Sequence, residues 1–575
     1  MADSQHLIRR RRVSRVGIVI VSALAAIGAL AGSAAAQPAG PARLPAAASS
    51  RVACTVPALQ AGLHVSGATV ASATMVTGGS YTATGSTSPL TGLPSVCAAA
   101  LIQPDSAGNP IGIAVWLPAR WNGRFEGTGG GGYSCGISYQ SLATGIESGY
   151  ATASTDCGAP GSGALGDSWV VNQNGTLDAA LAEDFASVGI HDMSMDGKAV
   201  TADYYKSAPK FSYFDGCSTG GREALMEAQR YPADYNGIVS GSPAINWTRF
   251  IPSELWPELV MKENNDYLPT CKETAFTDAV AAACATQGGV TSPYIADPAR
   301  CHWNPATLVG TSTPCGAITA TDAKVIREIW DGPTNAVGRR LWYGLEPGAS
   351  LSGLAGTSTS ASGVTTGDPF PISVEWIGTW LEQNPSFDWT TLTHAQFGRL
   401  FKQSVAEYSN LIATDNPNLS RFKTDGGKII IYHGLADQLI FPQGTINYYE
   451  RVERAMGGAR RTDSFARLFL APGAQHCADA AGPMPDNPLA AVVSWVERGQ
   501  APASLPASLT DASGVVTFSR PLCMFPLTAS YIGSGSTDVA SSFTCTRQRR
   551  GPGGDGRATA TLLRSGRAFS RRNIA

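Results

Sequence analysis

Residues 211–231, FSYFDGCSTGGREALMEAQRY, predict a strand, a tight turn and a helix. They fit the pattern Gly-x-Ser-x-Gly around Ser218, in which a strained strand-to-helix turn holds the serine Oγ above a sheet. Tyr213 and Phe214 suit a buried strand, and residues 222–229 are mostly strong helix formers. The glycines beside Ser218 let the helix approach the strand closely. The stretch therefore predicts a nucleophilic serine, and the backbone N–H just after it would point at a developing oxyanion.

Two of the seven histidines follow apolar strands and are candidates for a catalytic base. His433 sits too close to the end of its strand to swing as a base, so we expect it to pack beside a neighbouring acid loop. His476 lies on a loop after its strand and is the predicted base. The other five lie in the leader, in a Gly/Ser/Thr-rich stretch or away from an acid and a turn: His6, His64, His191, His302 and His394.

Asp437 is the predicted acid. An α/β-hydrolase needs a serine, an acid and a histidine in that chain order, with the acid and base on loops after late strands. The rivals Asp425 and Asp463 flank their strands on the entering side, whereas a triad acid belongs at the exit. Ser218, Asp437 and His476 satisfy the required order.

Two cysteines flank the predicted nucleophile and base. Cys217 directly precedes Ser218, and Cys477 directly follows His476. A disulfide between them would hold the serine and the histidine side by side. In the chain-entropy model, closing so long a loop contributes up to about 5 kcal/mol. Two unrelated buried thiols are the alternative.

The N-terminus predicts export. Residues 1–36 combine a basic region at 9–15, an apolar region at 16–30 and an A-x-A-type cleavage site at 33–36, as in a signal peptide. We expect a secreted or periplasmic protein that starts near Gln37, with an uncleaved anchor as the alternative. The apolar region is short for a membrane span and no later stretch is long enough, so we expect no span in the mature chain. An oxidising compartment makes the 12 cysteines a disulfide set.

Composition sets the scale of the molecule. With 575 residues, 43% of them hydrophobic, the chain can bury a large core and should form more than one unit. A net charge of −2 argues against nucleic acid or an anionic membrane as the main partner.

The alternation of strands and helices predicts a core in two parts. It breaks over residues 246–415, which are rich in Trp, Gly and Thr and indicate an inserted lid. Within this segment, Thr319 and apolar residues at i,i+4 predict a capped helix over 321–330. The predicted units are a signal peptide at 1–36, an α/β-hydrolase core at 37–245 and 416–545, the lid at 246–415, and a basic disordered tail at 546–575. The expected core strands include 111–117, 150–156, 235–239, 428–432 and 466–470.

Three motifs together resemble the tannase/feruloyl esterase family, which also includes bacterial mono(2-hydroxyethyl) terephthalate hydrolases. They are Cys-Ser-Thr-Gly-Gly-Arg from residue 217, Tyr-His-Gly-Leu-Ala-Asp from 432 and Ala-Pro-Gly-x-x-His-Cys from 471. The resemblance extends from about Cys54 to Cys545. It implies a secreted serine esterase with an α/β-hydrolase core and a large inserted lid. It also implies catalytic roles for Ser218, Asp437 and His476, and an active-site disulfide between Cys217 and Cys477.

Four consecutive glycines, Gly129–Gly132, follow early strand signals. Hydrolases of this class take a second oxyanion N–H from a Gly-rich loop early in the sheet. The resemblance places that donor at Gly132, with Thr219 as the other donor. A merely flexible loop is the alternative, and a phosphate cradle is disfavoured because no Gly-Lys-Ser/Thr follows.

The cysteines between 284 and 301 mark a departure from the family. Many members carry a calcium loop between two cysteines, with Asp ligands. Here the matching positions are Ala285, Gly288 and Ser292, which supply no carboxylate, so we predict no calcium and no other cofactor. The further expected disulfides are Cys54–Cys97, Cys284–Cys301 and Cys523–Cys545, whereas the pairing of four cysteines stays open: Cys135, Cys157, Cys271 and Cys315.

The resemblance also bears on the substrate. The terephthalate hydrolases bind a free carboxylate through a lid arginine, and Glu375 lies roughly at that place here. A neutral phenolic or aromatic ester is therefore the expected substrate. An acyltransferase with the same triad and a non-catalytic phenolic-binding relative are the alternatives.

Overall fold

A nine-stranded sheet runs through the protein, which we describe from a computed structural model covering residues 51–547 except 85, 87, 160 and 162. The predicted signal peptide and nearly all of the predicted basic tail lie outside the described residues. The α/β class expected from the sequence is confirmed. In spatial order the strands are β1 (Thr69–Val76), β4 (Val96–Pro104), β5 (Pro110–Pro118), β7 (Ala151–Thr155), β6 (Arg124–Thr128), β8 (Phe211–Cys217), β9 (Gly237–Gly241), β16 (Lys428–Gly434) and β17 (Ala466–Ala471).

The six strands from β7 to β17 pair with one another in parallel, whereas β1, β4 and β5 pair antiparallel. Cys217 at the end of β8 lies beside Gly241 of β9, and Gly241 lies beside Tyr432 of β16. Because parallel strands end at the same edge, the loops after β8, β16 and β17 meet there.

Side chains alternate between the two faces of the parallel strands, as the period of two requires. Ile429 and Ile431 pack in the cluster that contains helices α4 (Gly189–Tyr205), α5 (Thr219–Arg230) and α13 (Pro442–Ala455). Ile430 packs on the other face, where helix α15 (Pro488–Arg498) contributes Trp495. Both faces are covered, so the strands read as continuous apolar runs.

One strand differs from its predicted bounds. The sequence predicts 235–239, but β9 begins at Gly237 and continues to Gly241. Tyr235 lies before the strand, with its ring packed against Phe214 and its hydroxyl bonded to Ser194 of α4. The Tyr235 ring therefore packs between helix α4 and the sheet and is not part of strand β9.

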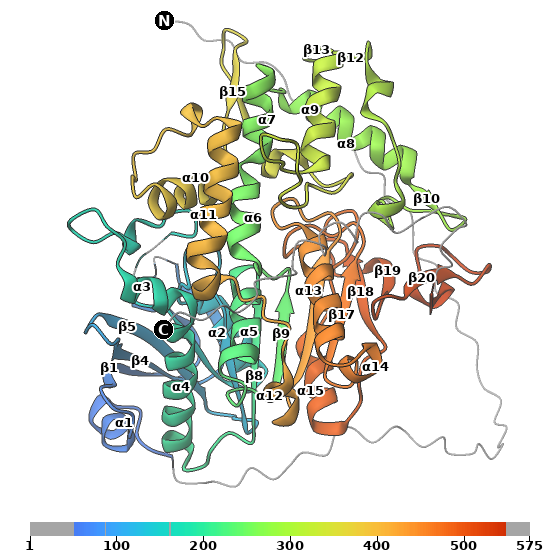
Figure 1. Cartoon of the computed structure of the whole chain (residues 1–575). Helices are drawn as coiled ribbons and strands as arrows, with labels where there is room; N and C mark the ends of the chain where they lie inside the picture. The colour runs from blue at the N-terminus through green and yellow to red at the C-terminus, as the bar shows by residue number, and fades with distance from the viewer. Residues whose placement is uncertain (1–50, 85, 87, 160, 162, 548–575) are drawn as a thin grey trace, which may run out of the picture. The chain divides into compact units, whose positions relative to one another are not determined.

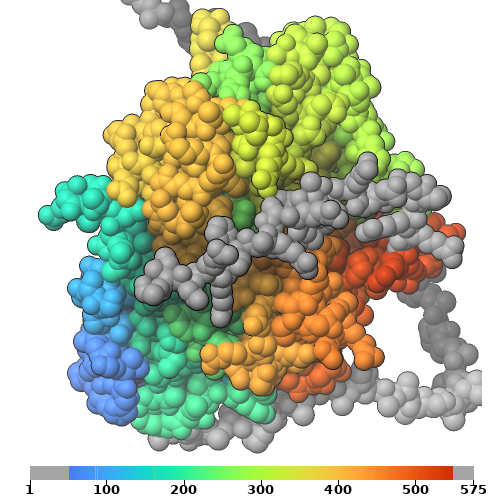
Figure 2. All heavy atoms as spheres, in the orientation of Figure 1, coloured from blue at the N-terminus to red at the C-terminus, as the bar shows by residue number. Residues whose placement is uncertain are grey.

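The longer elements of the chain between β9 and β16 are helices (Figure 1), and Figure 2 shows the atoms of this stretch in green to light orange. Helices α6 and α11 pack along one another. Thr319 and Asp322 form a capping box at α9, so the helix predicted from the sequence is present. The lid boundaries at 246 and 415 remain predictions. The α-helices of this segment are α6 (Trp247–Glu254), α7 (Trp256–Asn264), α8 (Thr270–Cys284), α9 (Ala320–Asp331), α10 (Pro371–Glu375), α11 (His394–Ile412) and α12 (Ser420–Thr424).

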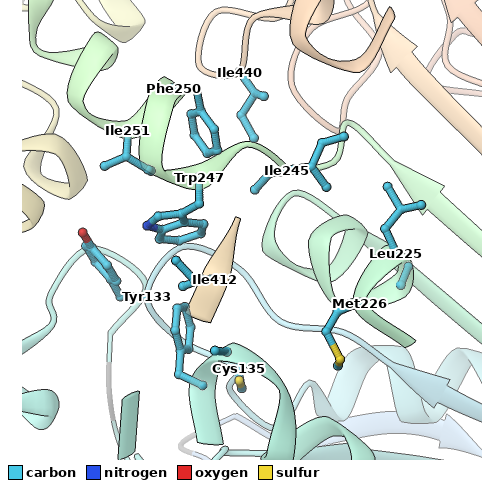
Figure 3. Packing of buried hydrophobic residues seen from close by; sticks show 14 of the residues in the cluster. Tyr133, Cys135, Leu225, Met226, Ile245, Trp247, Phe250, Ile251, Ile412 and Ile440 are labelled. Atoms are coloured by element: carbon cyan, nitrogen blue, oxygen red, sulfur yellow. The ribbon is translucent and has the colours of Figure 1, made fainter. Parts of the chain in front are cut away.

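Aromatic rings connect this helical segment to the glycine-rich loop of the core. The Tyr133 ring lies 5.8 Å from that of Trp247, centroid to centroid (Figure 3). Trp247 lies 6.2 Å from Trp376 by the same measure. Trp376 in turn stacks on Trp380 at 4.9 Å. These three tryptophans are buried, so they are part of the hydrophobic core. Among the described residues, no helix is long and apolar enough to cross a membrane.

Two carboxyl groups meet where the loop after β7 contacts α10. Asp167 is buried and accepts a hydrogen bond from Thr379 Oγ1 at 3.1 Å, and Thr379 also lies 3.4 Å from the Glu375 carboxylate. Burial, followed by the proximity of Glu375, raises the pKa of Asp167 to about 8. The carboxyl is therefore neutral in the folded protein at mildly acidic pH.

We expect stability to fall as pH rises, in part because of this pair. A carboxyl with a raised folded pKa stabilises the fold at low pH, and that contribution is lost as pH rises through the folded value, here about 8. In Asp167→Asn the fall between pH 5 and pH 9 should be smaller than in the wild type, measured as Tm against pH. Asp278→Asn, at an exposed position of α8, is the control and should follow the wild type. An Asp167→Asn curve parallel to the wild type would contradict this account.

Candidate active site

Ser218 occupies a strained turn between β8 and α5. Its φ of 64° and ψ of −125° lie in a region that residues with a Cβ rarely adopt. Its N–H donates to Gly241 O at 3.0 Å, and its carbonyl accepts from Ala244 N at 3.0 Å. A Cβ on Gly216 would lie 2.5 Å from the backbone of Gly220, so only glycine permits this approach of strand and helix. The turn presents a half-buried Ser218 at the edge of the sheet.

The serine, histidine and aspartate singled out in the sequence lie together. His476 Nε2 is 2.9 Å from Ser218 Oγ, and His476 Nδ1 is 2.8 Å from Asp437 Oδ2. Because the carboxylate can only accept, Nδ1 carries the proton and Nε2 is left to accept from the serine hydroxyl. The arrangement can remove a proton from Ser218 and hold the imidazolium that results.

Asp437 is fully buried and fully hydrogen-bonded. Its Oδ1 accepts the backbone N–H groups of Leu439 and Ile440, each at 2.9 Å. Burial alone would raise its pKa, but the charge of His476 and the hydrogen bonds from His433 and His476 outweigh it and hold the pKa well below its ordinary value. The carboxylate stays ionised throughout the neutral range.

His433 has a larger part in the site than the sequence indicated. It packs beside the acid loop, as expected, but its Nε2 also lies 3.1 Å from the same Asp437 Oδ2 that His476 contacts. The carbonyl of Ile440 is 3.1 Å from this Nε2, and Thr445 Oγ1 is 2.9 Å from Nδ1. With two acceptors at Nε2, that nitrogen donates. No local pattern marks this role, because it depends on the fold of the loop after β16.

The loop that carries His476 is held at both sides. Cys477, with a φ of 53°, is disulfide-bonded to Cys217, the residue before the serine. The backbone N–H of His476 donates to Gln438 Oε1 at 3.0 Å. Gln438 was not recognised in the sequence, since a glutamine in a loop carries no distinguishing signal.

The glycine-rich loop approaches the serine turn from β6. Gly131 O accepts from Ser134 N at 3.1 Å, and the peptide bond to Gly132 is trans, so the Gly132 N–H points away from Ser134. Gly132 has a φ of 61°, and a Cβ there would overlap Ala164 O. Thr219 is the first residue of α5, so its N–H has no acceptor within the helix. The two predicted oxyanion donors thus belong to adjoining segments, joined by a 2.7 Å hydrogen bond from Thr219 Oγ1 to Gly132 O.

All twelve cysteines are paired. The four pairs expected from the sequence are present, and the four cysteines left open form two further pairs. The disulfides are Cys54–Cys97, Cys135–Cys157, Cys217–Cys477, Cys271–Cys315, Cys284–Cys301 and Cys523–Cys545.

Two places in the described structure bear on metal binding. The loop between Cys284 and Cys301 is closed by protein groups, since Ser292 N donates to Ala285 O and Gln287 bonds to Asp297. The second place is formed by His191, Glu227 and Asp234, whose ligand atoms lie within 4.8 Å of one another. There the Lys198 ammonium lies 3.2 Å from Asp234 Oδ1 and supplies the positive charge that a cation would bring.

Comparison with known proteins agrees with these features. A sequence model described as "Tannase and feruloyl esterase" matches residues 97–546. A probable feruloyl esterase of Arthroderma benhamiae is 43% identical over 444 residues, covering 76% of this chain and 82% of that protein. An uncharacterized esterase of Xanthomonas campestris pv. campestris is 31% identical over 576 residues, covering 93% and 95%.

Solved structures resemble the fold over most of its length. A tannin acyl hydrolase from Aspergillus niger has a TM-score of 0.77 and 26% identity, covering 86% of this chain and 96% of its own. Feruloyl esterase B from Aspergillus oryzae has a TM-score of 0.74 and 27% identity, covering 85% and 100%.

Removing the disulfide beside the serine should lower turnover as well as stability. We expect Cys217→Ala/Cys477→Ala to lose about 2–5 kcal/mol of unfolding free energy. We also expect kcat to fall by at least about tenfold, since misplaced reacting groups lose rate steeply. The control is Cys523→Ala/Cys545→Ala, whose disulfide joins β19 (Val516–Cys523) to β21 (Phe543–Thr546) and flanks none of the three triad residues; it should lose stability but keep kcat. Denaturant titration and ester turnover measure both effects, and equal kcat values in the two double variants would refute the prediction.

We further predict that the loop between Cys284 and Cys301 holds no calcium. Metal analysis of extensively dialysed protein should find less than stoichiometric calcium, and EDTA should leave Tm unchanged, because the loop lacks the carboxylates that make such sites tight. One calcium per chain after dialysis would prove this prediction wrong.

Proposed function

This chain belongs to the tannase and feruloyl esterase family, and we propose that it is a secreted serine esterase that cleaves phenolic or aromatic esters through an acyl-enzyme on Ser218. As a member of this family it is a carboxylic ester hydrolase. The proposal adds the catalytic residues, the steps and the location of the enzyme.

The observation that carries the proposal is the hydrogen-bonded series Ser218–His476–Asp437. Its two distances, 2.9 Å and 2.8 Å, lie within the range needed for proton transfer and for orientation of the imidazole. Gly-x-Ser-x-Gly at a strand-to-helix turn, with acid and base after later strands, is the arrangement of α/β-hydrolase triads.

Acylation begins when Ser218 Oγ attacks the ester carbonyl while His476 Nε2 takes its proton. Asp437 holds the imidazole with its proton on Nδ1 and stabilises the charged form. The N–H groups of Thr219 and Gly132 bind the oxyanion of the tetrahedral intermediate. Removing one such donor typically costs about 3 kcal/mol of transition-state stabilisation.

The alcohol then departs with the proton from His476, which leaves an ester between the acyl group and Ser218. Water enters the place of the alcohol and gives its proton to His476 as it attacks. The second tetrahedral intermediate collapses to the free acid and the regenerated serine. No cofactor is needed for either half of the reaction.

The inserted segment 246–415 is proposed to be the lid over this site. Its first helix, α6, begins a few residues after Ala244, whose N–H bonds to Ser218 O. The segment also contacts the glycine-rich loop through α10, because the Tyr133 hydroxyl donates to Ile372 O at 2.9 Å. Glu375 lies roughly where the terephthalate hydrolases have their carboxylate-binding arginine, which supports a neutral acyl group rather than one with a free carboxylate.

Secretion is supported by the N-terminal sequence pattern and by the disulfides. Residues 1–36 have the composition of a signal peptide. Six disulfides, with no free cysteine among the described residues, suit an oxidising compartment.

The proposal is tested by turnover of p-nitrophenyl acetate, methyl ferulate and methyl gallate by the wild type and Ser218→Ala. We expect the wild type to hydrolyse at least one aryl ester and Ser218→Ala to lose about 10⁴-fold or more in kcat, because the covalent step is removed. The ratio of ferulate to gallate turnover would begin to define the acyl pocket.

Substitution of a surface serine gives the control. Ser513→Ala, on an exposed turn near the C-terminus, should retain wild-type turnover. A Ser218→Ala variant that hydrolyses these esters at the wild-type rate would remove Ser218 from the mechanism. Transfer of the acyl group to an added alcohol in preference to water would favour an acyltransferase.

A further inference from the structure

The glycine-rich loop is fastened to the first turns of α5 by three hydrogen bonds. Gly220 N donates to Gly130 O at 2.9 Å, and Gly130 N donates to Glu223 Oε2 at 2.9 Å. The third bond runs from Thr219 Oγ1 to Gly132 O at 2.7 Å. Two of the three bonds depend on side chains, those of Thr219 and Glu223. The proposed chemical steps use the backbone N–H of Thr219 but neither of these side chains.

The threonine bond joins the two halves of the proposed oxyanion site. Thr219 supplies one N–H through its backbone, and its hydroxyl holds the carbonyl of Gly132, the residue that supplies the other. Thr219 is buried and follows Ser218 directly. Its side chain therefore fixes the distance between the two donors, independently of its own N–H.

Glu223 anchors the same loop one turn further along α5. Its side chain is completely buried, and Arg222 lies 3.6 Å away as its charged neighbour. Burial raises the pKa of Glu223 to about 7, while Arg222 and the Gly130 N–H act in the opposite direction. Arg222 is itself held by the carbonyls of Phe185 and Ala186, each at 2.8 Å. The carboxylate is thus a fixed acceptor in a rigid setting.

The loop lies so close to α5 that its backbone cannot approach the helix further. A Cβ on Gly129 would overlap Gly220 Cα and lie 2.8 Å from Glu223 Oε2. A Cβ on Gly130 would overlap the backbone of Ser134 and Cys135. Backbone-to-backbone packing of this kind contradicts a merely flexible glycine loop. Because it limits only the approach to α5, the three hydrogen bonds are what keep the loop from moving away from the helix.

We propose that Thr219 and Glu223 are positioning residues that set the oxyanion site by holding the glycine-rich loop against α5. This inference rests on the proposed function, in which Thr219 N–H and Gly132 N–H bind the oxyanion. The Thr219 hydroxyl aligns Gly132 directly, and the Glu223 carboxylate aligns it through Gly130. Since the oxyanion forms only in the transition state, misalignment lowers kcat and leaves KM nearly unchanged.

Thr219→Val is the decisive variant, because it keeps the shape and the backbone N–H and removes only the hydroxyl. With methyl ferulate or p-nitrophenyl acetate we expect kcat to fall about 10- to 100-fold, near the effect of losing an oxyanion donor, with KM within about twofold. Thr219→Ser restores the hydroxyl and should recover most of kcat. Thr201→Val is the matched control, since Thr201 is a buried threonine of α4 whose hydroxyl bonds to Gly197 O at 2.7 Å, and it should keep kcat.

Glu223 is tested by Glu223→Gln, which keeps an acceptor for Gly130 N–H, and Glu223→Leu, which does not. The glutamine variant should stay within about threefold of wild-type kcat and the leucine variant should lose about tenfold or more. Circular dichroism and Tm establish that each protein is folded. Should Glu223→Leu fail to fold, the Thr219 pair alone decides.

The outcomes separate this inference from the proposed function. Ser218→Ala without turnover, together with Thr219→Val at wild-type kcat, overturns the positioning role while leaving the triad intact. Thr219→Ser as slow as Thr219→Val also overturns it, since the hydroxyl would then not be the cause. Turnover by Ser218→Ala would instead refute the proposed function on which the inference depends.

Discussion

The strained backbone of Ser218 is the constraint on which the rest of the site depends. A residue with a Cβ at a φ of 64° costs on the order of 1–3 kcal/mol, and it persists only where the surroundings over-determine it. Here β9 holds the turn through Gly241, and the chain after β9 holds it through Ala244. The strain lifts the serine above the end of β8, where it can meet groups from other strands. Helix α5 must start at that point, so the same turn places the N–H of Thr219, the proposed first oxyanion donor.

The parallel sheet and the disulfides complete the arrangement. Because β8, β16 and β17 end at one edge, Asp437 and His476 arrive beside Ser218 from far along the chain. A buried carboxylate would be unfavourable there by itself. Two histidines and two backbone N–H groups satisfy it, and the ring nitrogens of His433 contact Asp437, Ile440 and Thr445. The disulfide between Cys217 and Cys477 then joins the loop that carries His476 to the turn that carries Ser218.

Much of the fold and of the candidate site could be predicted because their signals are local. The Gly-x-Ser-x-Gly turn around Ser218 can be recognised from adjacent residues, and the cap at Thr319 from four residues. The strands before Asp437 and His476 can be recognised from short apolar runs. The parts that were missed have no local signal. Gln438 and His433 act through hydrogen bonds set by the loop after β16, and the bond from Thr219 to Gly132 joins residues far apart in the chain. At Tyr235 an aromatic side chain suited to a strand packs between helix and sheet instead.

The sequence by itself determined which residue types carry the chemistry, their order along the chain and the elements that present them. It did so because turns, caps and periodic burial depend on neighbours a few residues away. Only the tertiary structure decided which groups touch. The pairing of Cys135 with Cys157, the sharing of one Asp437 oxygen by two histidines, and the seating of the glycine-rich loop on α5 are such cases. Each depends on strand order and register, which arise from packing over the whole sheet and leave no mark in any single stretch of sequence.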